Sequence, residues 1–197
     1  MKSEERRAAI VQSAIHIFAE KGFRGTTTRE LASALGVTEP VLYQHFRTKH
    51  DLYSAIIEAK SAEVSGRGAE LLKLAKGNDD RAFFTLLGDL VLERYKNDPE
   101  LTRLLFFSCL ERHELADLFF ERQVQQFYKL VSGYIRRRSR AGAFRRANAE
   151  LAARGLIGMI AYHGLIGFLY PGRFGKPDRR VVEEMVTMYL EGIVPRD

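Results

Sequence analysis

Residues 22 to 52 hold two short segments of helical pattern, each preceded by a residue that starts helices and separated by a sharp turn. A basic residue, Lys49, follows three positions after the end of the second segment at Phe46. Two short helices in this arrangement form a helix-turn-helix, whose second helix lies in the major groove of DNA. The chemistry that this segment predicts is therefore the binding of phosphates and base edges.

The first helix of this module is expected to begin near Thr27. Thr27 and Glu30 have the spacing of a capping box, in which the threonine oxygen accepts from a first-turn amide and the glutamate reaches back. Leu31 and Leu35 continue an apolar stripe, and Gly36 can adopt the left-handed conformation that ends a helix. These signals predict a helix of about two turns.

The second helix is expected to begin at Thr38, a candidate N-cap. Pro40 falls in the first turn, where its missing N–H removes no intrahelical bond. Leu42 and Phe46 are four residues apart and face a core, which leaves the opposite face free. An earlier helix ends at Gly22, and its apolar stripe consists of Ile10, Ala14, Ile17 and Phe18.

The pattern resembles the DNA-binding domain of the TetR (tetracycline-repressor) family of bacterial regulators over roughly residues 4 to 64. The matching elements are Gly22-Phe23, Thr27-Thr28-Arg29, Leu31-Ala32, Leu35-Gly36-Val37, Leu42-Tyr43, His45-Phe46, and Lys49 with Leu52. The resemblance implies phosphate contacts for Thr28, Tyr43, His45 and Lys49, and base-edge contacts for Arg29, Glu39, Pro40 and Val41. Gln44 is a further candidate reader, and Thr27 and Thr38 complete the candidate DNA-binding residues.

Glu39 is the only acidic member of that set. A carboxylate in a groove lined by phosphates is unfavourable unless it accepts from a cytosine amino group or orients Arg29. The alternative is that Glu39 caps its own helix.

The rest of the chain predicts helices and shows no β-alternation, so the expected fold is all-α. Thr48 and Asp51 form another capping box, which opens a long helix leading into the body. We expect a DNA-binding domain over residues 1–60, with the helix-turn-helix at about 27–46, and an effector-binding and dimerisation domain over 61–197. The candidate helices of the body are 49–75, 80–96, 99–113, 115–141, 148–170 and 178–193.

The stretch from Gly155 to Gly172 is uncharged over 18 residues, near the lower length for a membrane span. A helix buried between its own domain and a partner subunit is favoured instead, so we expect a homodimer and no membrane partner. The expected interface residues are apolar and lie in the last two helices: Leu156, Met159, Ile160, Ile166, Val182, Met185, Val186 and Tyr189.

The family resemblance also implies a small-molecule effector bound inside the body. Aromatic residues at helical spacing are usually core residues, but aromatic walls with a few polar groups also suit a flat or amphipathic ligand. The candidate pocket residues are Phe84, Phe106, Phe127, Tyr162 and His163.

The net charge is +6, from 31 basic and 25 acidic residues, and six arginines without an acid lie between Arg136 and Arg146. This run is either a second phosphate contact or the cation-rich end of a helix, and the second is favoured. Cys109 is the only cysteine, which excludes a disulfide within one chain. No signal peptide is recognisable, so the cytoplasm is the expected location.

Enzymatic chemistry finds little support. Cys109 and His113 share a helical face, but a nucleophile also needs an orienting group and an oxyanion site. The stretch from His113 to Asp117 starts like a zinc-protease motif, with Asp117 at the second ligand position. We expect no catalytic residue, metal or cofactor.

The sequence thus predicts a DNA-binding transcriptional regulator, most simply a repressor that an effector releases. One alternative is an effector-independent DNA binder, acting as an activator or in chromosome organisation. The other is a helical ligand-binding protein or enzyme with a vestigial DNA-binding head.

Overall fold

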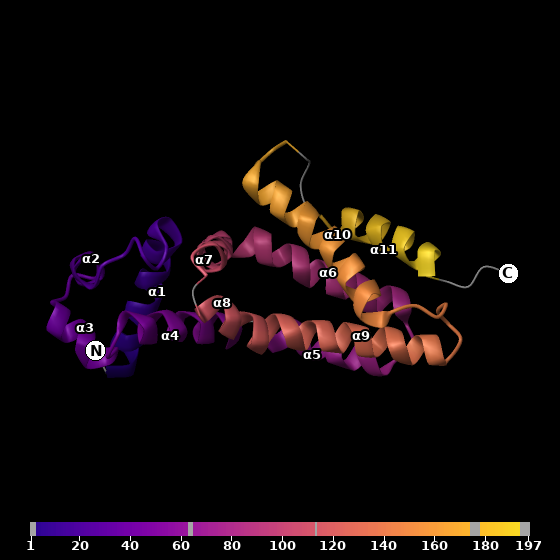
Figure 1. The fold of residues 1–197 in the computed structure, drawn as a ribbon, viewed down its shortest axis with the longest axis horizontal. Coiled ribbons are helices and arrows are strands. Elements are labelled where there is room, and N and C mark those ends of the chain that lie inside the picture. Colours follow the sequence, from indigo (N-terminus) through magenta and orange to yellow (C-terminus); the bar gives the residue numbers. More distant parts are fainter. Residues whose placement is uncertain (1–2, 63–64, 113, 174–177, 194–197) are drawn as a thin grey trace. The chain divides into compact units, whose positions relative to one another are not determined.

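The computed structural model describes residues 3–62, 65–112, 114–173 and 178–193. Within these ranges the chain consists of α-helices, one π-helical turn and their connections, with no strand (Figure 1). The all-α prediction is confirmed.

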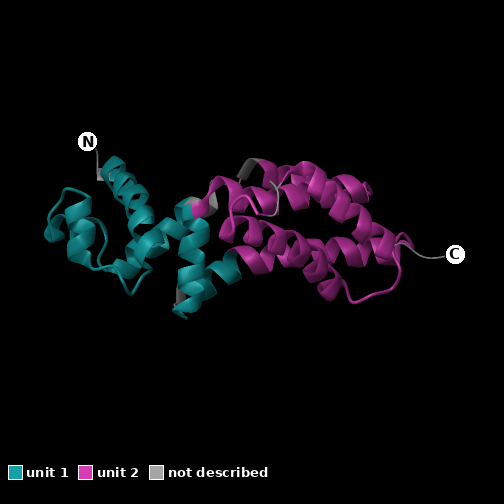
Figure 2. Cartoon of the chain, turned by 90° about the horizontal axis from the view of Figure 1, so that it is seen from above, with its two compact units in different colours: residues 1–64, 100–122 teal, residues 65–99, 123–197 magenta. Residues whose placement is uncertain are grey.

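The chain divides into two compact units (Figure 2). Unit 1 comprises residues 1–64 and 100–122, and unit 2 comprises residues 65–99 and 123–197. The division differs from the predicted one, because residues 100–122 join the DNA-binding head. The physical reason is that Leu101 and Leu104 are buried in the core of unit 1, where the hydroxyl of Tyr53 donates to the carbonyl oxygen of Leu104 at 3.2 Å.

Unit 1 packs its helices around one apolar core. In chain order the helices are α1 (Ser3–Lys21), α2 (Thr28–Ala34), α3 (Glu39–His45), α4 (Lys49–Ala62), α7 (Pro99–Leu110) and α8 (Glu114–Phe119). α1 packs against α2 and α4, and α2 packs against α3. The short helix α2 therefore packs between the longer α1 and the equally short α3.

The two predicted capping pairs and the stop signal at Gly36 are present in unit 1, whereas Thr38 occupies the N-cap position of α3 without a side-chain capping hydrogen bond. The Thr27 hydroxyl accepts from the Glu30 amide at 3.2 Å, and the Glu30 carboxylate accepts from the Thr27 amide at 3.0 Å. Thr48 and Asp51 form the second reciprocal pair, at 3.0 and 3.1 Å. Gly36 has φ of +64°, so it ends the α2 segment as expected.

Unit 2 is built around α6. Its helices are α5 (Ser65–Lys76), α6 (Asp80–Asn97), α9 (Gln125–Arg140), α10 (Ala149–Leu169) and α11 (Arg179–Ile193). α6 packs against α5, α10 and α11, and α9 packs against α10. The predicted segment 115–141 is divided by the π-helical turn Phe120–Val124, and residues 63 and 64 of the predicted segment 49–75 lie outside the described residues.

α10 is long and apolar enough to cross a membrane by length and composition alone. A core helix of a soluble protein passes the same test, and one face of α10 is indeed buried in unit 2. That face includes Ala153, Leu156, Ile157 and Ile160. The opposite face is exposed at Leu151, Met159, Tyr162 and Leu169.

Gly88 allows three helices to meet in the core of unit 2. A Cβ atom at this position would lie 2.4 Å from a methyl carbon of Val182 on α11 and 3.1 Å from Ile160 on α10. Such distances leave no room for even one methyl group. Close approach of α6 to both neighbours therefore requires glycine.

We predict that Gly88→Ala lowers the free energy of unfolding by roughly 1–3 kcal/mol, because overpacking forces neighbouring side chains out of position. Gly133→Ala in α9 is the matched control, since no atom lies within 4 Å of its added Cβ. The control should stabilise the protein by about 0.5–1 kcal/mol through lower chain entropy in the unfolded state. Denaturant unfolding followed by circular dichroism measures both changes, and equal effects of the two substitutions would contradict the packing argument.

Candidate nucleic-acid interface and small-molecule groove

α3 presents one face to the core of unit 1 and the other to solvent. Leu42 and Phe46 are each 3% exposed, whereas Tyr43 is 45% exposed. Pro40 lies in the first turn of α3, after Thr38 at the N-cap position. The helix-turn-helix geometry is therefore present, with a free outer face on its second helix.

The candidate DNA-binding residues differ in exposure. Thr27, Arg29, Thr38, Pro40, Tyr43 and Gln44 are exposed, and Thr28, Glu39, Val41, His45 and Lys49 are partly buried. Tyr43 and Gln44 lie in the last turn of α3, and Thr27, Arg29, Thr38 and Pro40 lie at the N-terminal ends of α2 and α3. This is the region of a helix-turn-helix that approaches base edges.

Glu39 has a partner that the sequence did not suggest. Its carboxylate accepts a hydrogen bond from the Thr28 hydroxyl at 2.9 Å. The bond joins the first turn of α2 to the first turn of α3 and thereby fixes the angle of the turn between them. It engages the Thr28 proton within the protein, whereas the resemblance assigns that hydroxyl to a phosphate.

Lys49 points into unit 1. Its ammonium group donates to the carbonyl oxygens of Phe23 at 2.5 Å and Thr26 at 2.7 Å, and it lies 4.0 Å from the centre of the Phe23 ring. Burial lowers the pKa of Lys49, and the Glu111 carboxylate opposes that shift. In this geometry Lys49 holds the loop between α1 and α2, and the phosphate contact that the resemblance implies stays a prediction.

The capping residue Glu30 also forms an ion pair with a residue of α1. Its carboxylate pairs with the Lys21 ammonium at 2.8 Å. This hydrogen bond, with those from the Thr27 amide and hydroxyl, lowers the pKa of Glu30 to about 2. The N-terminus of α2 is consequently held by charge as well as by its cap.

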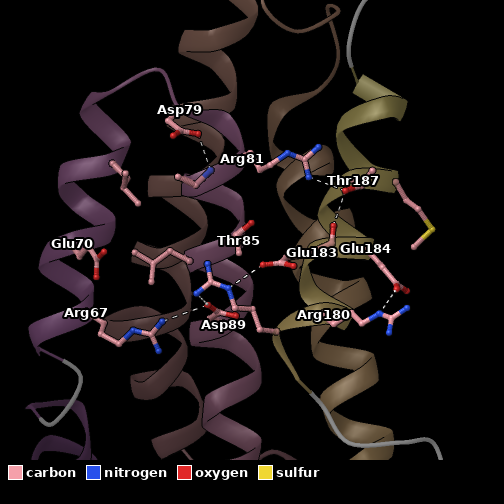
Figure 3. A pocket seen from close by; sticks show the side chains of 15 residues that line it. Arg67, Glu70, Asp79, Arg81, Thr85, Asp89, Arg180, Glu183, Glu184 and Thr187 are labelled. Atoms are coloured by element: carbon pink, nitrogen blue, oxygen red, sulfur yellow. Dashed lines mark hydrogen bonds and ion pairs between the residues drawn. The ribbon is translucent and has the colours of Figure 1, made fainter.

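A hollow of about 980 Å³ lies in unit 2, between α5, α6 and α11 (Figure 3). Apolar side chains such as Leu74, Leu86 and Met188 contribute to its lining. Most of the charges around it are paired, and the pairs are Arg67 with Glu93, Arg179 with Glu183, and Arg180 with Glu184. We call this hollow the α6 groove.

Asp89 lines one end of the α6 groove, and Asp79 lines the other (Figure 3). The Asp89 side chain is only 12% exposed and lies 3.6 Å from a guanidinium nitrogen of Arg67 and 3.9 Å from one of Arg179. These distances exceed those of a good hydrogen bond, because each arginine is closer to another carboxylate. Burial is the main cause that raises the pKa of Asp89, and the two arginines oppose it.

The five candidate pocket residues are not gathered around the α6 groove. Phe84 is fully buried and packs edge-on against Tyr134 and Tyr189, so it is a core residue. Phe127 packs on the same core, and Phe106 lies on α7 in unit 1. Tyr162 is 66% exposed on α10, and His163 is half-buried beside it. The residues that line the groove include no aromatic side chain, so aromatic content gave no signal for it.

Burial corrects half of the expected interface residues. Leu156, Ile160, Val182 and Val186 are fully buried in the core of unit 2, where no partner can reach them. The other four, Met159, Ile166, Met185 and Tyr189, retain exposed surface. Helical periodicity had marked both faces of α10 and α11, and only packing separates them.

Half of the arginine run is used within unit 2. Arg138 binds both oxygens of Asp80 at 2.7 and 2.8 Å, and Arg137 donates to the Asn78 side chain at 2.8 Å. Arg136 pairs with Glu150. The remaining arginines, Arg140, Arg145 and Arg146, are exposed.

The residues weighed for catalysis do not form a site in the described part of the chain. Cys109 is an exposed free thiol, and burial of its surroundings raises its pKa, which disfavours the reactive thiolate. His113 lies outside the described residues. Among those described, no group of His, Cys, Asp and Glu side chains is placed to hold a metal ion.

Two family models match this chain. The model for bacterial regulatory proteins of the tetR family matches residues 10–56, and the model for the C-terminal domain of AefR-like transcriptional repressors matches residues 94–192, just over half of the chain. The first match contains the helix-turn-helix. The second begins before α7 and ends in α11.

Known proteins show the same likeness. The nucleoid occlusion factor SlmA of Mannheimia succiniciproducens is 28% identical over 65% of this chain and 61% of its own length. The HTH-type transcriptional repressor KstR2 of Rhodococcus jostii is 29% identical over 76% of this chain and 73% of its own. The crystal structure of AibR in complex with isovaleryl coenzyme A and operator DNA has the same fold, with a TM-score of 0.67, 18% identity and coverage of 93% and 97%.

We predict that Lys49→Met weakens DNA binding through the fold rather than through lost phosphate contact. Two loop carbonyls lose their donor, which should cost about 1–3 kcal/mol of unfolding free energy. The dependence of DNA affinity on salt concentration should stay unchanged, because no phosphate contact is removed. A salt slope reduced by about one unit with unaltered stability would instead assign Lys49 to the DNA backbone.

Proposed function

The chain belongs to the TetR family of bacterial regulatory proteins, and from this premise we propose that it is a homodimeric, sequence-specific DNA-binding regulator. It represses transcription until a small-molecule effector releases it from its operator. The observation that carries the proposal is the exposed outer face of α3, whose inner face is anchored by Leu42 and Phe46. This arrangement presents a rigid helix of the kind that enters the major groove.

The proposed base-reading residues are Arg29, Pro40, Val41 and Gln44, and the proposed phosphate contacts include Tyr43 and His45. Arg29 and Tyr43 are exposed on either side of the turn. Arginine suits this role because its planar guanidinium can bind guanine through two hydrogen bonds. Glu39 serves by holding Thr28 rather than by reading a base.

The proposed dimer forms through the exposed faces of α10 and α11. Leu151, Met159 and Tyr162 of α10 and Met188 of α11 are large apolar side chains in contact with water in the single chain. Gly155 and Gly158 lie on the exposed side of α10 as well, which permits close approach of a second helix. A dimer would place two helix-turn-helix modules on half-sites about one DNA turn apart.

The proposed effector site is the α6 groove. Its volume falls within the range of roughly 300–1,000 Å³ that small-ligand sites occupy. Asp89, Thr85 and Thr187 supply polar groups around apolar patches, which suits an amphipathic ligand with hydrogen-bonding groups. The structure of AibR, solved with isovaleryl coenzyme A and operator DNA, supports the proposal, because a protein of the same fold binds both a small molecule and DNA.

A second candidate function follows from the similarity to the nucleoid occlusion factor SlmA. In this alternative the protein binds DNA without a releasing effector and acts in chromosome organisation. The discriminating property is whether any small molecule changes operator affinity, since an effector must bind the DNA-free state more tightly than the DNA-bound one.

The DNA-reading role predicts a specific behaviour of two variants. Operator fragments are first selected from genomic DNA with the purified wild type. Arg29→Ala should then lose roughly 1–3 kcal/mol of discrimination at one base position. Tyr43→Phe should weaken binding to all sequences alike, because phosphate contacts carry no sequence information. An unchanged preference profile in Arg29→Ala would remove Arg29 from the reading residues.

The effector role predicts a release curve that depends on Asp89. A library of amphipathic small molecules is titrated against the protein–operator complex, and a releasing compound should lower operator affinity. Asp89→Asn should reduce the response to that compound about tenfold while leaving operator affinity without ligand unchanged. Lys73→Gln, an exposed charge change on α5, should respond as the wild type does. If no compound alters affinity, the effector-independent binder is favoured.

A further inference from the structure

The loop between α1 and α2 sets the position of the DNA-reading residues at the start of α2. It runs from Gly22 to Thr26 and leads directly into the capping residue Thr27 and then Arg29. Gly22 has φ of +70°, and the Thr26 hydroxyl donates back to the Gly22 carbonyl at 2.7 Å. The loop is therefore a defined turn, and any displacement of it moves the N-terminus of α2.

Two charged side chains hold this loop from different helices. Lys49, at the start of α4, donates to the carbonyl oxygens of Phe23 and Thr26. Glu111, directly after α7, accepts from the amide of Phe23 at 3.2 Å and from the amide of Arg24 at 3.3 Å with each carboxylate oxygen. The cation thus satisfies carbonyls of the loop, and the anion satisfies its amides.

The backbone around Glu111 is built to hold that carboxylate. Its amide donates to the Phe107 carbonyl at 2.8 Å, which continues the last turn of α7. Arg112 follows with φ of +49°, a left-handed conformation that is unfavourable for a residue with a side chain. Helix α7 itself is anchored in unit 1, because Leu104 is fully buried and its carbonyl binds the Tyr53 hydroxyl.

Gly22 shows how closely the carboxylate approaches the loop. A Cβ atom at Gly22 would lie 2.6 Å from one carboxylate oxygen of Glu111 and 3.1 Å from the Phe107 ring. Any side chain at this position would displace Glu111 as well as strain the backbone. The glycine and the glutamate, 89 positions apart in sequence, are therefore parts of one arrangement.

We infer that Glu111 is a positioning residue for DNA recognition, through which α7 fixes the entry of α2. The inference rests on the proposed function. Residue 111 lies in the region matched by the C-terminal family model, whereas the loop lies in the region matched by the N-terminal model. A residue from the regulatory part of the sequence thereby sets the geometry of the reading head.

Loss of the Glu111 carboxylate should affect sequence-specific binding more than binding in general. Specific contacts need Arg29 within a fraction of an ångström of its base, whereas phosphate contacts tolerate movement. Without Glu111 the two loop amides lose their acceptor, and the loop can shift toward solvent to recover one. The reading residues then move while the charges that bind phosphate remain.

The test compares Glu111→Ala, Glu111→Gln and Glu58→Ala. Glu58 is the control, because its exposed ion pair with Arg122 lies in the same unit and away from the loop. Glu111→Gln keeps a side-chain carbonyl that can accept from one loop amide. For each variant the operator affinity, the affinity for random DNA, the salt slope and the exchange rates of the Phe23 and Arg24 amides are measured.

Glu111→Ala should lower operator affinity about tenfold, with affinity for random DNA and the salt slope changed by no more than about twofold. The two loop amides should exchange faster, Glu111→Gln should recover part of the loss, and Glu58→Ala should match the wild type. Operator affinity unchanged in both Glu111 variants, or specific and random binding reduced equally, would overturn the inference. If Glu111→Ala does not fold, the result for Glu111→Gln is judged alone by the same criteria. If the wild type selects no operator from genomic DNA, the result counts against the proposed function and not against the role of Glu111.

Discussion

A helix of seven residues does not form in water without support, and α3 has only seven. Its stability comes from Leu42 and Phe46, each of which contributes roughly 1.5–3 kcal/mol when fully buried. The outer face of α3 is consequently as well ordered as the core behind it. The proposed DNA recognition depends on this packing, because it holds the short surface helix α3 in one position.

The core behind α3 includes a helix from the later part of the chain. Tyr53 of α4 is fully buried, contacts the rings of Phe18 and Phe23, and places its hydroxyl between Leu104 and Ser108 of α7. A buried hydroxyl needs such partners, because an unsatisfied one is costly. The DNA-binding head is thus completed by α7, and the compact unit crosses the boundary between the two family matches.

The long helix α10 in unit 2 has one apolar face in the core and another in contact with solvent. α10 buries Ala153, Leu156 and Ile160 against the rest of unit 2 and leaves Met159 and Tyr162 exposed. Its two faces are both apolar, whereas the outer side of α11 carries charges that pair along the helix. The exposed side of α10 is the surface proposed for the dimer, and the charged side of α11 borders the α6 groove.

Local patterns in the sequence determined the elements of the head. The capping boxes at Thr27 and Thr48 and the left-handed Gly36 involve residues a few positions apart, so their chemistry is visible without a fold. The all-α class and the ends of most helices follow from the same short-range signals. The π-helical turn Phe120–Val124 within the predicted segment 115–141 carried no comparable signal and was missed.

Only the tertiary structure decided which side chains meet across the chain. Lys49 donates to the carbonyls of Phe23 and Thr26. Glu111 binds the same loop although it lies 88 residues after Phe23, and no periodic pattern in the sequence indicates this contact. The buried and exposed faces of α10 likewise look equally apolar until packing assigns one of them to the core. Local chemistry acts over one or two helical turns and can be recognised in sequence, whereas long-range contacts depend on the positions of whole helices, which only packing determines.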